Sequence, residues 1–360
     1  MENKKIKIGI THGDINGIGY EVILKSLADN RLAEFCMPLL YGSPKAAAYH
    51  RKVLDLPQIP MYQIASAKEI KADQINIINC NSEEVQVQLG TASAEAGEAA
   101  FQALEQAVDD LKNGCIDVLV TAPINKNTIQ NEKFNFPGHT EYLEKEAGEN
   151  EKSLMILLKD DLRVALVTGH IPLAEVPHGI TTEKILEKLL LFNRSLKQDF
   201  GIGRPRIAVL SLNPHAGDDG LIGKEEQEII TPAIKQAESK GLLVFGPYPA
   251  DGFFGSGTFE AFDGVLAMYH DQGLAPFKTI AMEEGVNFTA GLPFIRTSPA
   301  HGSAYDIAGQ NKASEESFRQ AMYTAIDIYR NRCSHKEANA NPLRKQFHDR
   351  GNDNEKLDLT

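Results

Sequence analysis

Three histidines far apart in the sequence carry the clearest chemical signal. His170 lies in VALVTGHIPL, His215 in LSLNPHAGDDG and His270 in VLAMYHDQGLAPFK. Each follows a short apolar run that predicts a buried strand, and Pro, Gly or Asp comes soon after it. Because ligands bind outside the carboxyl ends of strands in open α/β sheets, three such ends could bring the imidazoles together. Three imidazoles with an open position are typical of a catalytic Zn, Co, Ni or Fe site, although each histidine alone is better explained as a loop residue.

A second group of residues has the chemistry of an anion site. In FPGHTE, His139 and Thr140 follow a Pro-Gly turn and precede a helix that we expect to begin near Glu141. Backbone N–H groups at a helix N-terminus, together with a threonine hydroxyl, favour an anion. The alternative is a capping box, for which Glu144 lies one residue too far along.

Two further loops add charged and polar side chains. In YHDQGLAPFK, Asp271 is a candidate to orient His270 or to act on a metal. Lys278, in a predicted Pro-containing loop, is a candidate base or phosphate contact, unless it is simply a solvated lysine. Asn287 and Arg296 border an apolar stretch in a predicted loop, and the planar fork of arginine suits carboxylate or phosphate. We therefore take Lys278 and Asp271 as the catalytic candidates.

Residue types alone leave three reaction classes open. These are hydrolysis by a metal-bound hydroxide, oxidation of an alcohol with hydride transfer to a nicotinamide, and aldol or isomerase chemistry. No GxSxG motif is present, so the pattern of a serine hydrolase is missing.

The composition is that of an ordinary globular protein. The net charge of −12 over 360 residues argues against non-specific nucleic-acid binding. Four cysteines without CxxC spacing indicate a reduced, cytoplasmic protein. The N-terminus has no long apolar segment of a signal peptide, and no apolar run approaches the roughly 20 residues of a membrane span, so we expect no membrane partner.

Strand and helix patterns alternate along the chain and predict an α/β fold with a mostly parallel sheet and helices on both faces. Strands are expected at residues 6–10, 38–41, 75–78, 116–120, 154–158, 163–167, 207–212, 242–245 and 261–268. Helices are expected at residues 20–28, 44–54, 91–111, 182–200 with Thr181 or Thr182 as N-cap, 224–240 and 315–330.

Taken in order, THGDINGIGYE, TAPINK, FPGHTEYL, TGHIPL, LNPHAGDDG, AMYHDQGLAPFK and GLPFIRTSPAHGSAYDIAG resemble the 4-hydroxythreonine-4-phosphate dehydrogenase family of pyridoxal phosphate biosynthesis. The resemblance covers about residues 6–330. It implies that His170, His215 and His270 bind a divalent metal, Zn, Mg or Co. It also implies that the substrate is bound by His139, Thr140, Lys278, Asn287 and Arg296.

The resemblance also implies an architecture. The family has two α/β lobes, similar to those of isocitrate and isopropylmalate dehydrogenases, and forms a homodimer with its site at the subunit interface. The first lobe is expected to comprise residues 1–140 with about 290–335, and the second about 141–289. Residues 336–360 are expected to be a disordered charged tail, rich in Lys, Glu, Asn and Asp.

The implied reaction is oxidation of the C3 hydroxyl of 4-phosphohydroxy-L-threonine by NAD or NADP, followed by decarboxylation to 3-amino-2-oxopropyl phosphate. No residues are assigned to the nicotinamide cofactor. A sister group oxidises 4-phospho-D-threonate or 4-phospho-D-erythronate, and a metal-dependent phosphohydrolase is the alternative from another class. The first loop departs from the family's usual GDPAGIGPE at Ile15, Asn16 and Tyr20, and Asp251 is expected near the metal.

Overall fold

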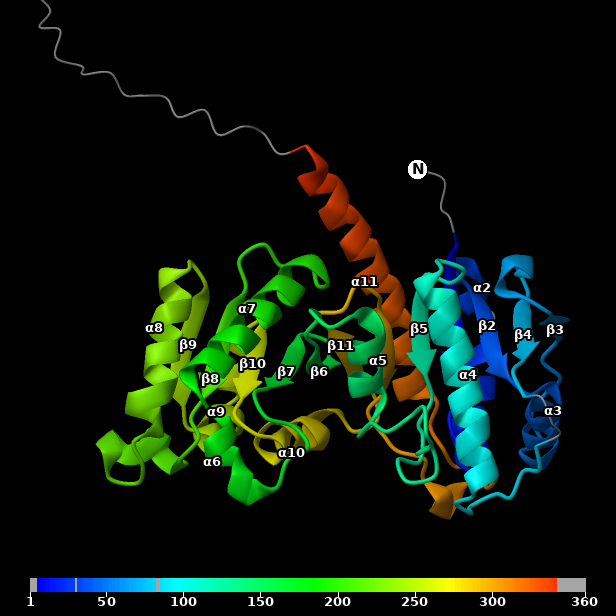
Figure 1. Ribbon diagram of the computed structural model, residues 1–360, viewed down its shortest axis with the longest axis horizontal. Helices are drawn as coiled ribbons and strands as arrows, with labels where there is room; N and C mark the ends of the chain where they lie inside the picture. Colours follow the sequence, from blue (N-terminus) through cyan, green and yellow to red (C-terminus); the bar gives the residue numbers. More distant parts are fainter. Residues whose placement is uncertain (1–4, 30, 82–84, 342–360) are drawn as a thin grey trace, which may run out of the picture.

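One twelve-stranded sheet is the central element of the fold (Figure 1). The computed structural model describes residues 5–29, 31–81 and 85–341. In sheet order the strands are β3 (Met61–Ile64), β4 (Ile75–Asn79), β2 (Cys36–Gly42), β1 (Ile6–Thr11), β5 (Val118–Thr121), β12 (Arg296–Pro299), β11 (Val286–Ala290), β6 (Leu154–Lys159), β7 (Leu162–Leu166), β10 (Gly264–Ala267), β8 (Arg206–Leu210) and β9 (Leu243–Tyr248).

Helices connect most of these strands. The α-helices are α1 (Gly19–Leu27), α2 (Leu32–Phe35), α3 (Pro44–Val53), α4 (Ala94–Lys112), α5 (His139–Ala147), α6 (Val176–Gly179), α7 (Thr182–Gln198), α8 (Thr231–Ser239), α9 (Ala250–Gly255), α10 (His270–Ala281) and α11 (Glu316–Ala340). The shorter turns are η1 (Ala67–Glu69), η2 (Leu173–Glu175), η3 (Pro214–Gly220), η4 (Glu226–Ile230), η5 (Thr258–Ala261) and η6 (Tyr305–Ile307).

Strand direction divides the sheet into two parallel halves joined by an antiparallel middle. The neighbours from β3 to β12 pair in parallel, and so do those from β7 to β9. The pairs β12–β11, β11–β6 and β6–β7 are antiparallel. The predicted α/β class with a mostly parallel sheet is therefore confirmed, and β6 and β7 form a hairpin.

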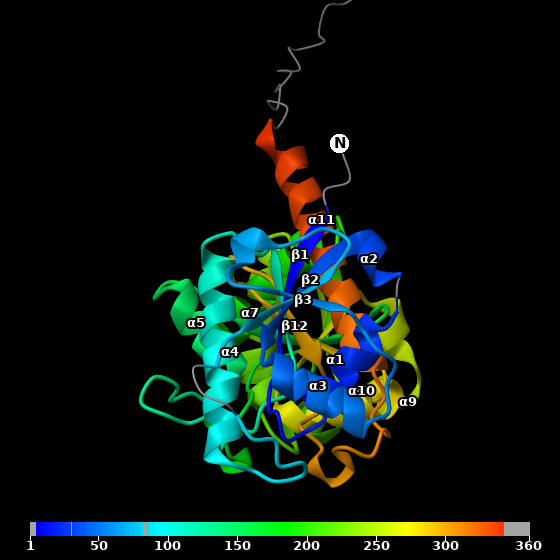
Figure 2. The same cartoon turned by 90° about the vertical axis from the view of Figure 1, so that its right-hand side faces the viewer.

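Helices cover both faces of the sheet, because the strands bury side chains on either side. Figure 2 shows α4 and α1 on opposite sides of the strands of the first half. One hydrophobic cluster lies beneath α1, α7, α8 and α11, a second beneath α4 and α5, and a third beneath α9 and α10.

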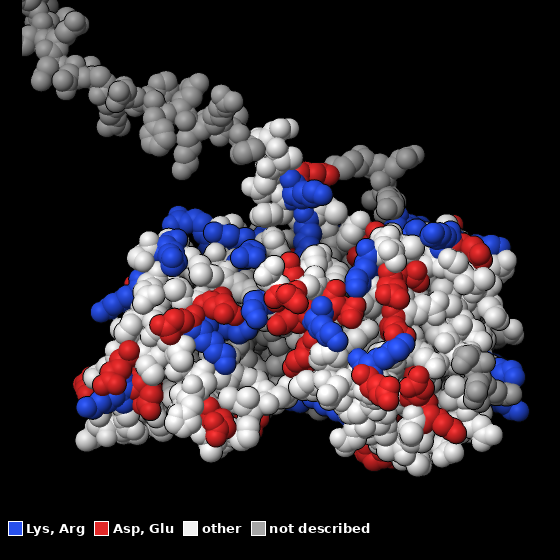
Figure 3. Space-filling model, in the orientation of Figure 1, with Lys and Arg blue, Asp and Glu red and all other residues white. Residues whose placement is uncertain are grey.

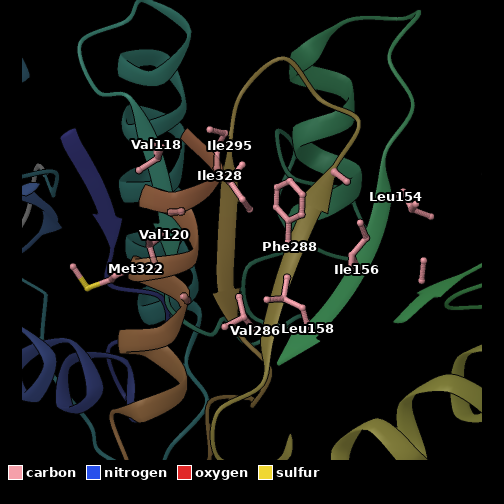
Figure 4. Packing of buried hydrophobic residues seen from close by; sticks show 14 of the residues in the cluster. Val118, Val120, Leu154, Ile156, Leu158, Val286, Phe288, Ile295, Met322 and Ile328 are labelled. Carbon is pink, nitrogen blue, oxygen red and sulfur yellow. The ribbon is translucent and has the colours of Figure 1, made fainter. Parts of the chain in front are cut away.

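The middle of the sheet is held by α11, which packs on β5, β11 and β12. Figure 4 shows Val120, Phe288 and Met322 among the buried side chains that join this helix to β5 of the first half and to β11 of the antiparallel middle. Farther along α11, Arg332 Nε donates to the buried Asp199 carboxylate at 2.6 Å, at the end of α7. The helix therefore ties the two halves of the sheet together.

The predicted end of the last helix near residue 330 is wrong, because α11 continues to Ala340. The segment 331–340 is poor in apolar residues, but its Ala, Glu, Lys and Arg are good helix formers that extend a helix already packed on the sheet. The rest of the expected tail, 342–360, lies outside the described residues.

Two other local predictions need correction. Residues 284–296 were expected to form a loop, but all of β11 lies in this stretch and β12 begins at its end. The stretch around Lys278, also expected to be a loop, is helix α10 despite Pro276 within it. By contrast, Thr181 is the N-cap of α7, and its side chain accepts a hydrogen bond from Lys184 N. No helix in the described part of the chain is both long and apolar enough to cross a bilayer.

Candidate active site

A cavity of about 280 Å³ lies where the antiparallel middle of the sheet meets the two halves. Its walls come from the end of β5, the start of α5, strands β6, β11 and β12, and helix α10, which occupy the middle of Figure 1. Met155, Leu157 and Leu274 form the apolar part of the lining. The volume suits a small metabolite.

Arg296 is the buried cation of this cavity. Its side chain is 3% exposed, and its guanidinium donates to Thr121 Oγ1 at 2.6 and 2.9 Å and to Thr289 Oγ1 at 3.3 Å. Burial lowers the pKa of Arg296 to about 9, while the Glu141 carboxylate acts in the opposite direction. Within the described residues Arg296 has no ion pair, and a buried cation without a counter-ion favours an anionic ligand.

His139 lies beside this guanidinium in the same cavity. Burial first, and then the charges of Arg296 and Lys126, hold the pKa of His139 well below its usual 6.5, so the ring is neutral. Arg296 lies 3.1 Å from Nδ1, which must then be the acceptor, and the ring proton is placed on Nε2. This buried Nε2 has no partner among the described residues, so it is a free donor for a ligand.

The other predicted substrate residues line the same cavity. Thr140 is in the first turn of α5, Asn287 is on β11, and Lys278 is two turns along α10 from His270. The buried Oδ1 of Asn287 makes no hydrogen bond in the described part of the chain. The structure thus brings together all five residues that were expected to bind the substrate.

Two of the three histidines reach this cavity as well. The rings of His170 and His270 lie with centroids 5.6 Å apart. His170 Nδ1 is 3.8 Å from a Glu141 oxygen, and this contact lowers the pKa of Glu141. His270 Nδ1 is 2.7 Å from Asp271 Oδ1, so Asp271 orients the ring and leaves Nε2 free.

His215 is not part of this group. It lies in a separate hollow with Asp251, Tyr269 and Gln272. No group of three or more His, Cys, Asp or Glu side chains within 5–29, 31–81 and 85–341 could hold a metal ion. The chain by itself therefore presents two imidazoles in one place and the third in another.

Two cavity residues were not assigned a role from the sequence, Lys126 and His301. Lys126 follows β5, and His301 follows β12; the buried Nε2 of His301 has no partner among the described residues. Burial lowers the pKa of His301. Lys126 lies in TAPINK, three residues after Pro123, and His301 lies in SPAHGSAYDIAG, next to Gly302, so each stands close to Pro or Gly soon after a strand.

The unusual residues of the first loop have structural partners. Asn16 donates to Thr91 O at 2.8 Å and to Ser93 Oγ at 3.1 Å, so it anchors the start of α4. The ring of Tyr20 stacks between His12 and His50, with centroids 5.3 and 5.0 Å away. The departures at Asn16 and Tyr20 thus lie in packing contacts of the first half.

Comparison with known proteins agrees with this picture. A family model described as pyridoxal phosphate biosynthetic protein PdxA matches residues 34–325. A 4-hydroxythreonine-4-phosphate dehydrogenase of Bacteroides thetaiotaomicron is 61% identical, covering 100% of this chain and 98% of that protein. A relative from Oceanobacillus iheyensis, named for D-threonate 4-phosphate dehydrogenase, is 39% identical, covering 91% of this chain and 98% of that protein.

A solved structure shares the fold. The crystal structure of 4-hydroxythreonine-4-phosphate dehydrogenase from Klebsiella pneumoniae superposes with a TM-score of 0.77 at 35% identity, covering 91% of this chain and 100% of that one. The relatives and the shared fold define an α/β oxidoreductase, and its cavity is lined by the buried cation Arg296. The chain belongs to the PdxA family of pyridoxal phosphate biosynthetic proteins.

Proposed function

We propose that the chain oxidises the C3 hydroxyl of 4-phosphohydroxy-L-threonine with NAD or NADP. The oxidised product then loses CO₂ to give 3-amino-2-oxopropyl phosphate, a step in pyridoxal 5′-phosphate biosynthesis in the cytoplasm. One observation carries the proposal: the Arg296 guanidinium is buried in a small cavity and has no ion pair in the described part of the chain. A small phosphorylated amino acid supplies the missing negative charge.

The substrate is held at its charged and polar groups. Arg296 and the Nε2–H of His139 donate to an anionic end, and Thr140 adds a hydroxyl at the N-terminus of α5. Asn287 and Lys278 face the same space from β11 and α10. Fixing both ends of the substrate presents its C3 hydroxyl in one orientation, which lowers the entropic part of the barrier.

A divalent metal, Zn, Mg or Co, is part of the proposal. His170 and His270 fit two ligand positions, because both rings face the cavity and the Asp271 carboxylate leaves His270 Nε2 free. When bound, such a metal polarises the hydroxyl and stabilises the negative charge that develops on decarboxylation. His215 is the proposed third ligand.

His215 reaches the metal from a second copy of the chain, which makes the protein a homodimer with its site at the interface. Exposed apolar residues beside the histidines support this. Leu173, three residues after His170, is 72% exposed, and Leu221, six residues after His215, is 82% exposed. Large apolar side chains at such exposure are typical of a surface that another subunit covers.

Lys278 is the proposed proton acceptor for the C3 hydroxyl. It is in α10 and lines the cavity together with His270, eight residues earlier on the same helix. A lysine in this position also has the charge to bind phosphate, so its two roles must be separated by kinetics. Asp271 acts on the reaction through the orientation of His270.

The test is steady-state reduction of NAD and of NADP by the purified protein, with Zn, Mg or Co supplied. We expect reduction with 4-phosphohydroxy-L-threonine, and a Lys278→Met variant that loses kcat far more than it raises KM. The exposed Lys235 on α8 provides a matched control, Lys235→Met, with unchanged kinetics.

Two results would redirect the proposal. A higher kcat/KM with 4-phospho-D-threonate or 4-phospho-D-erythronate would assign the chain to the sister activity, for which the relative from Oceanobacillus iheyensis is named. Phosphate release without any nicotinamide would support a metal-dependent phosphohydrolase.

A further inference from the structure

We infer that Glu226 is a positioning residue for His215: its buried carboxylate fixes the strained turn that presents this imidazole. The inference rests on the proposed function, in which His215 is a metal ligand. It concerns a side chain that does not line the cavity with His170 and His270, nor the hollow with His215.

The turn that carries His215 has an unusual backbone. Five successive residues have positive φ: 52° at His215, 55° at Ala216, 80° at Gly217, 45° at Asp218 and 54° at Asp219. Four of these residues have side chains, and the left-handed region is disfavoured for residues with a Cβ, although less so for Asp than for Ala. Such a run persists only where its surroundings hold it, and strained backbone of this kind gathers at functional sites.

Glu226 fixes the residues that connect strand β8 to this turn. Its Oε1 accepts hydrogen bonds from Leu212 N and Asn213 N, both at 2.8 Å, and its Oε2 accepts from Asn213 Nδ2 at 3.0 Å. Glu226 is 3% exposed and has no ion pair in the described part of the chain. Its carboxylate therefore accepts hydrogen bonds from the backbone that leads into the turn.

The same carboxylate also touches the turn itself. A Cβ at Gly217 would lie 2.6 Å from Glu226 Oε2 and 3.0 Å from Gly223 O. Glycine is thus required here both for its φ of 80° and for the close approach of the carboxylate. Glu226 begins the π-helical turn η4, a rare geometry that is frequent at functional sites.

A second side chain, Gln272, also holds this strand end. Gln272 Nε2 donates to Ser211 O at 2.6 Å, and its Oε1 accepts from Met268 N at 2.7 Å, just before His270. Residues 211–213 are therefore held by hydrogen bonds to both Gln272 and Glu226. Without the carboxylate, the left-handed run can relax and carry His215 away from its position.

The experiment compares Glu226→Gln, Glu226→Ala and Gly217→Ala with the wild type in the full-length protein. Zinc affinity is measured by competition with a chelator, alongside kcat, KM and the thermal midpoint. We expect zinc affinity to fall about 10-fold in Glu226→Gln and toward 100-fold in the alanine variants. The lost kcat should return when zinc is added in excess, which a general folding defect would not permit.

Glu228→Gln is the matched control, because Glu228 is exposed and lies with Glu226 in η4. This variant loses the same charge and should bind zinc with wild-type affinity. His215→Ala separates the two hypotheses. If His215→Ala loses zinc while Glu226→Gln and Glu226→Ala keep wild-type affinity, the role of Glu226 is overturned and the proposed ligand stands. Wild-type zinc affinity in His215→Ala overturns both.

Discussion

The two halves of the molecule use histidine in different ways. His12, His50 and His139 belong to the first half and are buried. Burial lowers the pKa of His12 and of His50 to about 4, and the pKa of His139 is also well below 6.5. His170 and His215, in the second half, are exposed on loops after strand ends. The first group is held neutral inside the protein, whereas the second is available to bind something from outside.

This contrast divides the proposed site into two parts. We call the part that one chain completes the finished part, and the part that one chain leaves incomplete the unfinished part. The proposed anion-binding part, built around Arg296 and His139, is buried and hydrogen-bonded within one chain. The imidazole part presents His170 and His270 in the cavity, but His215 elsewhere. Figure 3 shows positive and negative side chains interspersed on one face of the molecule. The side chains proposed to anchor the substrate are thus already positioned within one chain, whereas the three imidazoles proposed to bind the metal are not.

Arg296→Met should have the largest effect on the finished part. It removes the buried cation and leaves the Thr121 hydroxyl and His139 Nδ1 without their partner. We expect kcat/KM to fall by about 100- to 1,000-fold, mainly through KM, because truncating a buried charged partner typically costs a few kcal/mol. The buried Arg163 stacks on Phe200 outside the cavity, and Arg163→Met is the control. Equal KM values in wild type and Arg296→Met would contradict the anion site.

Acid should destabilise the half that contains the buried neutral histidines. The folded pKa values of His12 and His50 are lowered to about 4, whereas the unfolded chain takes up these protons near 6.5. The unfolded state therefore binds more protons as the pH falls from 6.5 toward 4, and stability is lost over that range. At pH 5 the loss is about 2 kcal/mol for each of the two residues.

Urea unfolding at pH 7 and pH 5 measures this loss. His50 Nε2 lies 2.8 Å from Ile15 O, and a glutamine can keep this contact without titrating. His50→Gln should therefore show a smaller difference between the two pH values than the wild type. A wild type that is equally stable at both would show that these rings are not held neutral.

Asp271→Asn should have the smallest effect, on the unfinished part. An amide oxygen still accepts from His270 Nδ1, but without the negative charge that strengthens the bond. We expect metal affinity to fall about 10-fold, with KM for the substrate unchanged. Metal titration by calorimetry measures this, with the exposed Asp109→Asn on α4 as the charge-matched control. An unchanged metal affinity would exclude Asp271 as the residue that orients His270.

The local sequence pattern was sufficient to predict strands that are continuous apolar runs and helix starts with a capping side chain. The runs that became β1, β2 and β5 are apolar, and Thr181 has the side chain that an N-cap requires. Helix α10 was missed because Gly273 and Pro276 are loop signals. Gly273 is instead needed for close packing, since a Cβ there would lie 2.9 Å from Val164 Cγ1. Strands β11 and β12 were missed because they carry Asn287 and Arg296 into the cavity.

The candidate site was predictable to a different extent in its two parts. The motifs named His139, Thr140, Lys278, Asn287 and Arg296, which come together in one cavity. The roles of these residues, the two-lobe boundaries and the metal ligands stay predictions. The separation of His215 from the other two imidazoles was open at the sequence level, because strand ends do not reveal the direction of the turn that follows. The left-handed run after β8 determines that direction.

The most direct test is complementation between two inactive variants. His170→Ala and His215→Ala should each lose activity as homodimers. If His170 of one subunit shares a metal with His215 of the other, a heterodimer of the two variants has one intact site and one doubly defective site. A randomly mixed 1:1 population, co-expressed or refolded together, should then recover about a quarter of wild-type activity. Activity no higher than that of either variant alone would contradict a site completed by the second subunit.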